Sequence, residues 1–241
     1  RVEVVLPTKQ HSTNYSVYLT SGIEPIFGLA SDRDFSYSFT TETQVYILNV
    51  PIYRQQYSLS CEAAALRMAL AYRGVYVNDM DIVWQMGYNP RPRDNANNTW
   101  DDPDQMFVGD INGIQNSTGW GVWATPTARA ANNLGVSASP IYGVDSNYIA
   151  NQIWADRPVV VWGQLSRGAY DTWNTDSGRE IVGFKGEHAR TVVGVKGVPG
   201  DIKGFYINDP INSSRLFWTP DQLNAQLWSF GYASNQAVVV Y

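Results

Sequence analysis

The segment from Ser60 to Gly74 carries the strongest helix pattern in the sequence. A capping serine precedes Cys61-Glu-Ala-Ala-Ala-Leu-Arg-Met-Ala-Leu-Ala-Tyr72, and a glycine follows the run. Ala, Leu, Met, Glu and Arg are good helix formers, Ser is a common N-cap, and Gly is a common terminator. We therefore expect one helix here, with the single cysteine of the chain in its first turn.

The elements on either side of this helix differ in kind. Short alternating segments precede it and predict strands at residues 2–6, 15–20, 35–40 and 45–50. Further helices are indicated at residues 78–86 and 145–155, and by the capping pairs Thr125-Pro126 and Thr219-Pro220, where Gln222 completes a capping box. Apolar strands are expected at residues 158–164, 191–195, 204–208 and 237–241. Helices that lead and strands that follow predict an α+β fold.

Charge and cysteine content exclude several classes of protein. Seventeen Lys and Arg against 22 Asp and Glu give a net charge of -5 without a basic cluster, so we expect no nucleic-acid partner. The longest aliphatic runs, such as residues 158–162, are too short to span a bilayer, and we expect no membrane insertion. One cysteine permits neither an intrachain disulfide nor a metal site built on several thiolates.

Residues 88–122 follow neither the helix nor the strand period. A structureless stretch of this length is usually a functional loop or lid. Two interpretations stay open: a solvated excursion anchored by packed tryptophans, or a segment that contacts substrate through Trp100, Trp120 or Trp123. Trp162, in the strand at residues 158–164, is a further candidate for a substrate contact.

Cys61 is the candidate nucleophile. At the start of a helix, backbone N–H groups and the positive end of the dipole favour a thiolate and lower its pKa. A single cysteine in an Ala/Leu-rich helix can equally be a small buried hydrophobic residue. A base nearby would distinguish the two interpretations.

His188 is the candidate base. It begins an apolar strand within Gly186-Glu-His-Ala-Arg-Thr-Val-Val-Gly-Val195, whereas the other histidine, His11, lies in the N-terminal β segment. A hairpin about Val198-Pro-Gly-Asp201 places His188 opposite Asp209, whose carboxylate could accept the ring N–H and hold the other nitrogen toward a thiol. A slip of one residue would put Asn208 there instead.

Gln55 is the candidate oxyanion donor. It precedes Cys61 by six residues, a reach at which its amide could join the Cys61 backbone N–H. Adjacent side chains in an extended approach point to opposite sides, so we expect Gln55 to face the cleft and Gln56 to face away. A polar loop residue without a role is the alternative.

Together these parts resemble the papain-like cysteine peptidases. The closer resemblance is to stand-alone bacterial relatives of the double-glycine-leader (bacteriocin-processing) peptidases. It spans roughly residues 49–241 and is carried by Gln55 through Cys61-Glu62, Met68-Ala-Leu-Ala-Tyr-Arg-Gly74, Phe107-Val-Gly-Asp110, Pro158-Val-Val-Val-Trp162, Glu187-His188 and Asn208-Asp-Pro210.

This resemblance implies a papain-like fold, with a helical lobe followed by an antiparallel β lobe, and no cofactor. It also implies that Cys61 is the nucleophile, His188 the base and Asp209 the orienting group. This sequence contains no transporter segment and no ATP-binding loop, so leader cleavage coupled to export is not part of the expectation.

The leading interpretation is a cysteine peptidase that acts on an extracellular peptide or protein. Cell-wall peptide hydrolysis or acyl transfer would use the same groups, and a surface binding module that has lost catalysis is a third possibility. The oligomeric state is left open.

Residues 1–43 resemble the C-terminal half of a bacterial Ig-like domain. We therefore expect a β-rich segment over residues 1–44 and a peptidase domain over residues 45–241. That resemblance and the low lysine content, four of 17 basic residues, favour a secreted or cell-surface protein. Arg1 in place of an initiating Met indicates a processed or trimmed chain.

Overall fold

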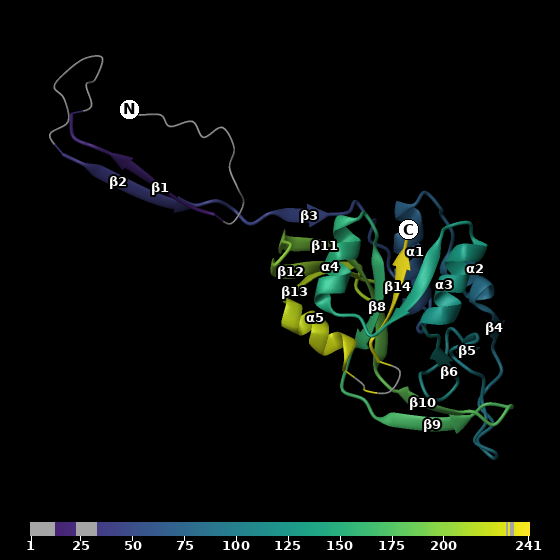
Figure 1. The fold of residues 1–241 in the computed structure, drawn as a ribbon. Helices are drawn as coiled ribbons and strands as arrows, with labels where there is room; N and C mark the ends of the chain where they lie inside the picture. The colour runs from purple at the N-terminus through teal and green to yellow at the C-terminus, as the bar shows by residue number, and fades with distance from the viewer. Residues whose placement is uncertain (1–12, 23–32, 230, 232–233) are drawn as a thin grey trace. The chain divides into compact units, whose positions relative to one another are not determined.

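The computed structural model describes residues 13–22, 33–229, 231 and 234–241 (Figure 1). The chain divides into two compact units, residues 1–45 and 46–241, and each is described by itself. The strand expected at residues 2–6 and the histidine at position 11 lie outside the described residues.

In the first unit the described residues form one antiparallel strand pair. β1 (Asn14–Leu19) pairs with β2 (Phe35–Thr40), so that Asn14 faces Thr40. The rings of Tyr15 and Phe39 stack across the pair at 5.6 Å. An isolated two-stranded pair is marginally stable in water. The resemblance to part of an Ig-like domain stays a prediction.

A seven-stranded sheet forms the centre of the second unit. Six of its strands pair antiparallel with their neighbours, in the order β13 (Ser214–Trp218), β12 (Asp201–Asp209), β11 (Glu187–Val198), β8 (Val159–Gln164), β14 (Gln236–Val240) and β7 (Ala138–Tyr142). The seventh, β3 (Val45–Ile47), also pairs with β11. The central strands are almost wholly buried, and apolar residues make up most of β8, β14 and the middle of β11, as is usual for strands covered on both faces.

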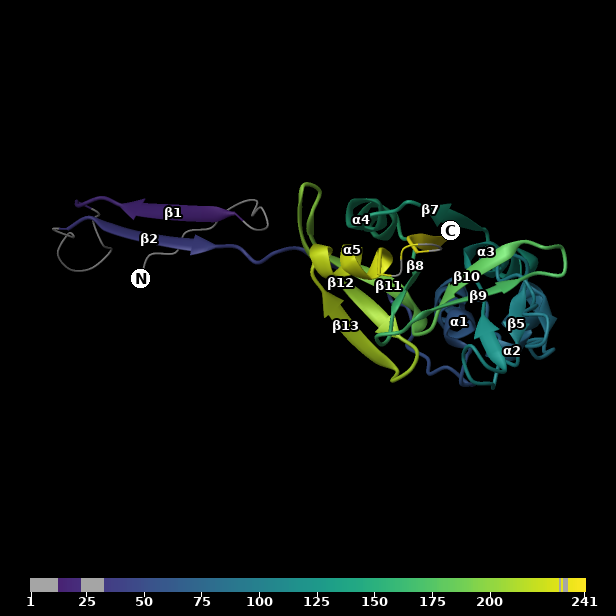
Figure 2. The same cartoon turned by 90° about the horizontal axis from the view of Figure 1, so that it is seen from below.

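Helices cover both faces of this sheet (Figures 1 and 2). α1 (Cys61–Tyr72), α2 (Asp79–Met86) and α3 (Ala124–Asn133) lie on one side, and α4 (Ser146–Trp154) and α5 (Pro220–Leu227) lie on the other. The described residues contain no helix long and apolar enough to cross a membrane. The predicted α+β, papain-like architecture is confirmed, with the first three helices ahead of most of the strands.

The helix starts agree with the sequence only in part. Thr219 caps α5 through the expected box with Gln222. Ser60 is the N-cap residue of α1, but its hydroxyl makes no capping bond and instead donates to Asp79 Oδ2 at 2.7 Å. The start predicted at Thr125 is wrong, because α3 begins at Ala124, whose N–H donates to a glutamine side chain of β14.

Residues 88–122 are more ordered than their sequence indicates. They contain the short strands β4 (Tyr88–Asn89), β5 (Phe107–Gly109) and β6 (Gly119–Gly121), which form a small sheet. Beside it lies a hairpin of β9 (Tyr170–Asn174) and β10 (Glu180–Phe184). The two enclose a second apolar cluster, which we call the tryptophan cluster: Trp100, Val108, Trp120, Trp123, Trp173 and Ile181. Strands of two or three residues are too short to show a period.

Gly109 marks a point in this region where no side chain fits. Its φ is +74°, and a Cβ there would lie 2.5 Å from Trp100 and 2.7 Å from the Thr118 carbonyl oxygen. Gly74, just beyond α1, has a similar φ of +84° but open space around it. A side chain at Gly74 would therefore meet backbone strain alone, whereas a side chain at Gly109 would meet both strain and a steric conflict.

Gly109→Ala should destabilise the protein more than Gly74→Ala. Left-handed strain alone costs about 1–2 kcal/mol, and overpacking adds about 1–3 kcal/mol at Gly109 only. Urea denaturation of both variants measures the difference in the free energy of unfolding. Equal losses would contradict the packing argument.

Candidate active site

β11 and β12 bring His188 and Asp209 together. His188 Nε2 lies 3.0 Å from Asp209 Oδ1, and both side chains are buried. An ionised carboxylate can only accept, so Nε2 carries the proton and Nδ1 is left for another partner. The predicted contact between a strand histidine and the carboxylate of the neighbouring strand is present.

The strand register differs from the one the sequence analysis assumed. Across the Pro199-Gly200 turn Val198 pairs with Asp201, and Thr191 pairs with Asn208. Asp209 therefore meets His188 diagonally, two residues from the expected position. An even offset keeps both side chains on the same face of the sheet. Asn208, the alternative partner, turns its amide toward the carbonyls of Val50 and Pro51.

Arg190 holds Asp209 from the other side and was missed in the sequence analysis. Its Nε donates to Asp209 Oδ2 at 2.7 Å, while the Ile211 N–H donates to Oδ1 at 2.9 Å. Burial acts to raise the pKa of Asp209, but His188 and Arg190 hold it well below its ordinary value. The spacing of two residues from His188 along one strand was the signal that could have found Arg190.

Cys61 lies against the same strand. It is the first residue of α1, and its sulfur accepts from the N–H of Ala189, next to His188, at 3.5 Å. Thr191 fixes the helix to the strand by donating from Oγ1 to the Ala65 carbonyl at 2.7 Å. The thiol also donates to Glu62 Oε2 at 3.2 Å.

The expected low pKa of Cys61 is not found in this arrangement. Burial raises the pKa of the thiol well above its ordinary value, and the neighbouring Glu62 raises it further, while the Ala189 N–H opposes them. Burial also lowers the pKa of His188, against the effect of Asp209. A helix dipole stabilises a thiolate by at most about 2 kcal/mol, which lowers its pKa by about 1.5 units. Burial can raise the pKa by about 3–5 units and therefore outweighs the dipole. Both shifts favour a neutral thiol and a neutral imidazole over an ion pair.

A small cavity of about 80 Å³ opens beside the sulfur. It is lined by residues from both sides of the site, among them Gln55, Cys61, Glu62, Trp120, Glu187 and His188. The nucleophile, the base and the candidate oxyanion donor thus share one space. Groups of three or more His, Cys, Asp or Glu side chains that could hold a metal ion do not occur among the described residues.

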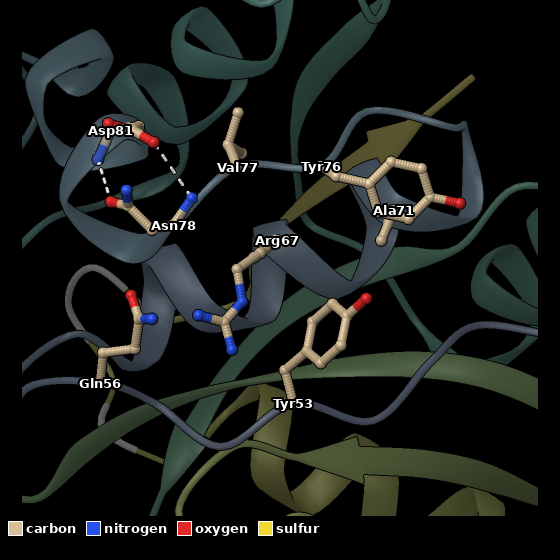
Figure 3. Close-up of a pocket in the computed structure, with 8 residues that line it drawn as sticks. All are labelled: Tyr53, Gln56, Arg67, Ala71, Tyr76, Val77, Asn78 and Asp81. Carbon is tan, nitrogen blue, oxygen red and sulfur yellow. Dashed lines mark hydrogen bonds between the residues drawn. The ribbon is translucent and has the colours of Figure 1, made fainter.

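Gln55 and Gln56 face different parts of the molecule, as predicted. Gln55 lines the cavity at Cys61, but its Nε2 donates to the carbonyls of Tyr57 at 2.8 Å and Ser58 at 3.0 Å. An oxyanion would have to compete with these carbonyls for the amide. Gln56 instead accepts from the N–H of Asp79 and lines a separate pocket with Arg67 (Figure 3).

Of the four tryptophans proposed to contact substrate, only Trp120 lines the cavity. Trp100 is fully buried in the tryptophan cluster and donates to the Arg91 carbonyl. Trp123 is buried in the same cluster, and Trp162 lies in the main core, where its indole donates to the Val122 carbonyl. Trp100 and Trp123 therefore have the anchoring role that was the alternative interpretation for residues 88–122.

Glu62 and Glu187 line the cavity and were not singled out by the sequence analysis. Burial raises the pKa of Glu62 to about 7. Burial and the nearby Glu62 raise the pKa of Glu187 well above its ordinary value, with Trp123 acting in the opposite direction. An acidic residue in the first turn of a helix is ordinarily explained by its favourable interaction with the helix dipole, so the sequence gives no separate signal for Glu62.

Three solved structures resemble this chain. A C39-like peptidase from Bacillus anthracis has 24% identity and a TM-score of 0.67, covering 82% of this chain and 98% of that one. The double glycine motif protease of an AMS/PCAT transporter, in complex with the leader peptide, has 18% identity and a TM-score of 0.43, covering 81% and 94%. The peptidase domain of Streptococcus ComA, a bifunctional ABC transporter of a quorum-sensing pathway, has 13% identity and a TM-score of 0.47, covering 80% and 98%.

A search of curated proteins finds no significant match. The family model described as "Peptidase_C39 like family" matches residues 47–238, which is most of the chain and includes Cys61, His188 and Asp209. The peptidase from Bacillus anthracis shares the fold of this chain over 98% of its own length. This chain therefore belongs to the C39-like family of cysteine peptidases.

Proposed function

We propose that the protein hydrolyses an amide bond of an extracellular peptide or protein, with Cys61 as nucleophile, His188 as base and Asp209 as orienting group. The observation that carries the proposal is the hydrogen bond from His188 Nε2 to Asp209, on a strand whose next N–H contacts the Cys61 sulfur. The resemblance of residues 1–43 and the low lysine content support the extracellular location.

In the reaction, His188 Nδ1 takes the thiol proton as the Cys61 sulfur attacks the substrate carbonyl carbon. The resting site favours the neutral pair, so proton transfer accompanies attack and does not precede it. Collapse of the tetrahedral intermediate breaks the C–N bond, and His188 returns the proton to the leaving amine. Water, deprotonated by His188, then hydrolyses the thioester.

The oxyanion of that intermediate needs hydrogen-bond donors beside the sulfur. We infer that the Cys61 N–H and the Gln55 amide supply them, since Gln55 lines the same cavity. The Gln55 amide would exchange one of its loop carbonyls for the oxyanion. The same groups would serve cell-wall peptide hydrolysis or acyl transfer.

A peptide library derived from a whole proteome tests the activity. Incubation with the protein, followed by mass spectrometry of new termini, should reveal cleavage products that are absent with Cys61→Ser. Products that appear equally with both proteins would contradict the proposal, as would no products at all.

Asp209→Ala should retain measurable turnover, whereas Cys61→Ser and His188→Ala should not. An orienting group acts through the base, and its removal typically costs about a hundredfold less than loss of the nucleophile or base. Asp201→Ala, at the other end of β12, is the matched control and should leave kcat unchanged. Equal losses for Asp209→Ala and His188→Ala would contradict the orienting role.

Gln55→Ala should lower kcat by about a hundred- to a thousandfold, with little change in KM. Gln56→Ala, which removes a side chain directed at Asp79, should leave kcat within a few fold of wild type. A larger loss for Gln56→Ala would reverse the assignment.

The alkylation rate of Cys61 should rise only at high pH. Because burial and Glu62 raise the thiol pKa, the midpoint of the rate with iodoacetamide should lie above the ordinary thiol value of about 8.5. Glu62→Gln removes a negative neighbour and should move the midpoint to lower pH, whereas Glu180→Gln, an exposed glutamate on β10, should not. A wild-type midpoint well below the ordinary value would indicate a preformed thiolate–imidazolium pair.

A further inference from the structure

The proposed hydrolysis leaves two buried carboxyl groups of the cavity without a role. Glu187 is 9% exposed, and neither of its oxygens makes a hydrogen bond of good geometry; its neighbour Trp123 offers only an uncharged indole N–H. Glu62 is 5% exposed; its Oε1 accepts from the Val122 N–H at 3.2 Å, and its Oε2 accepts from the Cys61 thiol. Both side chains line the cavity beside the sulfur.

No positive side chain in the described part of the chain pairs with either carboxyl. Arg190, the cationic side chain beside His188, is paired with Asp209 and also donates to the Gln164 carbonyl. Apart from Cys61 and His188, no further titratable side chain lines the cavity. Burying two carboxyl groups side by side without an opposite charge lowers stability, so folding alone does not explain Glu62 and Glu187.

We propose that Glu62 and Glu187 bind a positively charged group of the substrate, an ammonium or a guanidinium, next to the bond that Cys61 attacks. This cation site rests on the proposed function, because the cation belongs to the substrate of that hydrolysis. Trp120 and Leu165, on the wall of the same cavity, would pack along the aliphatic stem of such a group. The bound cation would supply the opposite charge that Glu187 lacks.

Binding of a cation should be coupled to proton release. Glu62 is about half protonated near pH 7, because burial raises its pKa to about 7, and burial and Glu62 also raise the pKa of Glu187. A cation favours the ionised forms, so its attraction to the site should grow as the pH rises through neutrality. His188, with a lowered pKa, adds no opposing charge in this range.

Three thiol reagents of one mechanism and different charge test the site without any peptidase assay. Methyl, 2-aminoethyl and 2-sulfonatoethyl methanethiosulfonate each transfer their thioalkyl group to the Cys61 thiolate and release methanesulfinate. Dividing the rate of the charged reagent by that of the neutral one cancels the thiolate fraction. The ratio therefore reports the size and charge of the reagent near the sulfur, and its change with pH and in the carboxyl variants isolates the charge.

We expect the aminoethyl reagent to exceed the methyl reagent by on the order of tenfold at pH 8, and the excess to shrink at pH 6. Glu187→Gln and Glu62→Gln should each reduce the ratio severalfold, while Glu180→Gln should preserve it. A ratio near one in the wild type, or a ratio unchanged in both cavity variants, would overturn the proposal. Should one variant fail to fold, the other and the pH dependence of the wild type decide.

The source of the cation is decided with peptides that carry either an internal lysine or a free amino terminus, each compared with an acetylated counterpart. Cleavage that falls at least tenfold on lysine acetylation assigns a side chain, and a fall on terminal acetylation assigns the amino terminus. Cleavage insensitive to both would overturn the proposal while leaving the proposed hydrolysis intact. Without cleavage of any peptide, the proposed function fails and the reagent ratio alone decides the cation site.

Discussion

The arrangement of the site depends on the hydrogen bonds that the Asp209 carboxylate accepts. It accepts from His188 and Arg190 on one strand and from the Ile211 N–H on its own chain segment. These three donors keep it ionised although it is buried, and a buried carboxylate with fewer donors would take up a proton. Its charge fixes the tautomer of His188, and the same strand then presents Ala189 to the sulfur of Cys61. Asp209 thus orients the base, while the bonds from Ala189 to Cys61 and from Thr191 to Ala65 hold the helix against the strand.

Much of this site could be predicted from local sequence. The α1 boundaries follow from propensity and from the glycine at its end, and the alternation of side chains on a strand brings His188 and Asp209 to one face. The two-residue turn at Pro199-Gly200 and the bulges beyond it set the actual register, which shifts the contact to a diagonal. A shift of two residues leaves both side chains on the same face of the sheet, so the predicted face is correct although the predicted directly opposite pair is not.

The remainder could not be predicted because it depends on burial and on distant partners. The pKa of Cys61 follows from the environment in which α1 is packed, and position in a helix says nothing of that environment. Trp100 and Trp123 resemble substrate contacts in sequence because aromatic residues in an irregular segment serve either purpose. Only the neighbouring hairpin of β9 and β10, far along the chain, shows that the tryptophan cluster is a second core.

The complete burial of α1 has a consequence for how the family can vary. Every residue from Cys61 to Ala71 is buried, and five of these eleven are alanines against which other elements pack closely. A larger side chain in such a core typically costs about 1–3 kcal/mol, while removing a large side chain opens a cavity. Substitutions are therefore restricted on all sides of the helix, including the sides that never meet substrate. Relatives should diverge in loops and at the sheet edge long before they diverge along the helix that carries the nucleophile.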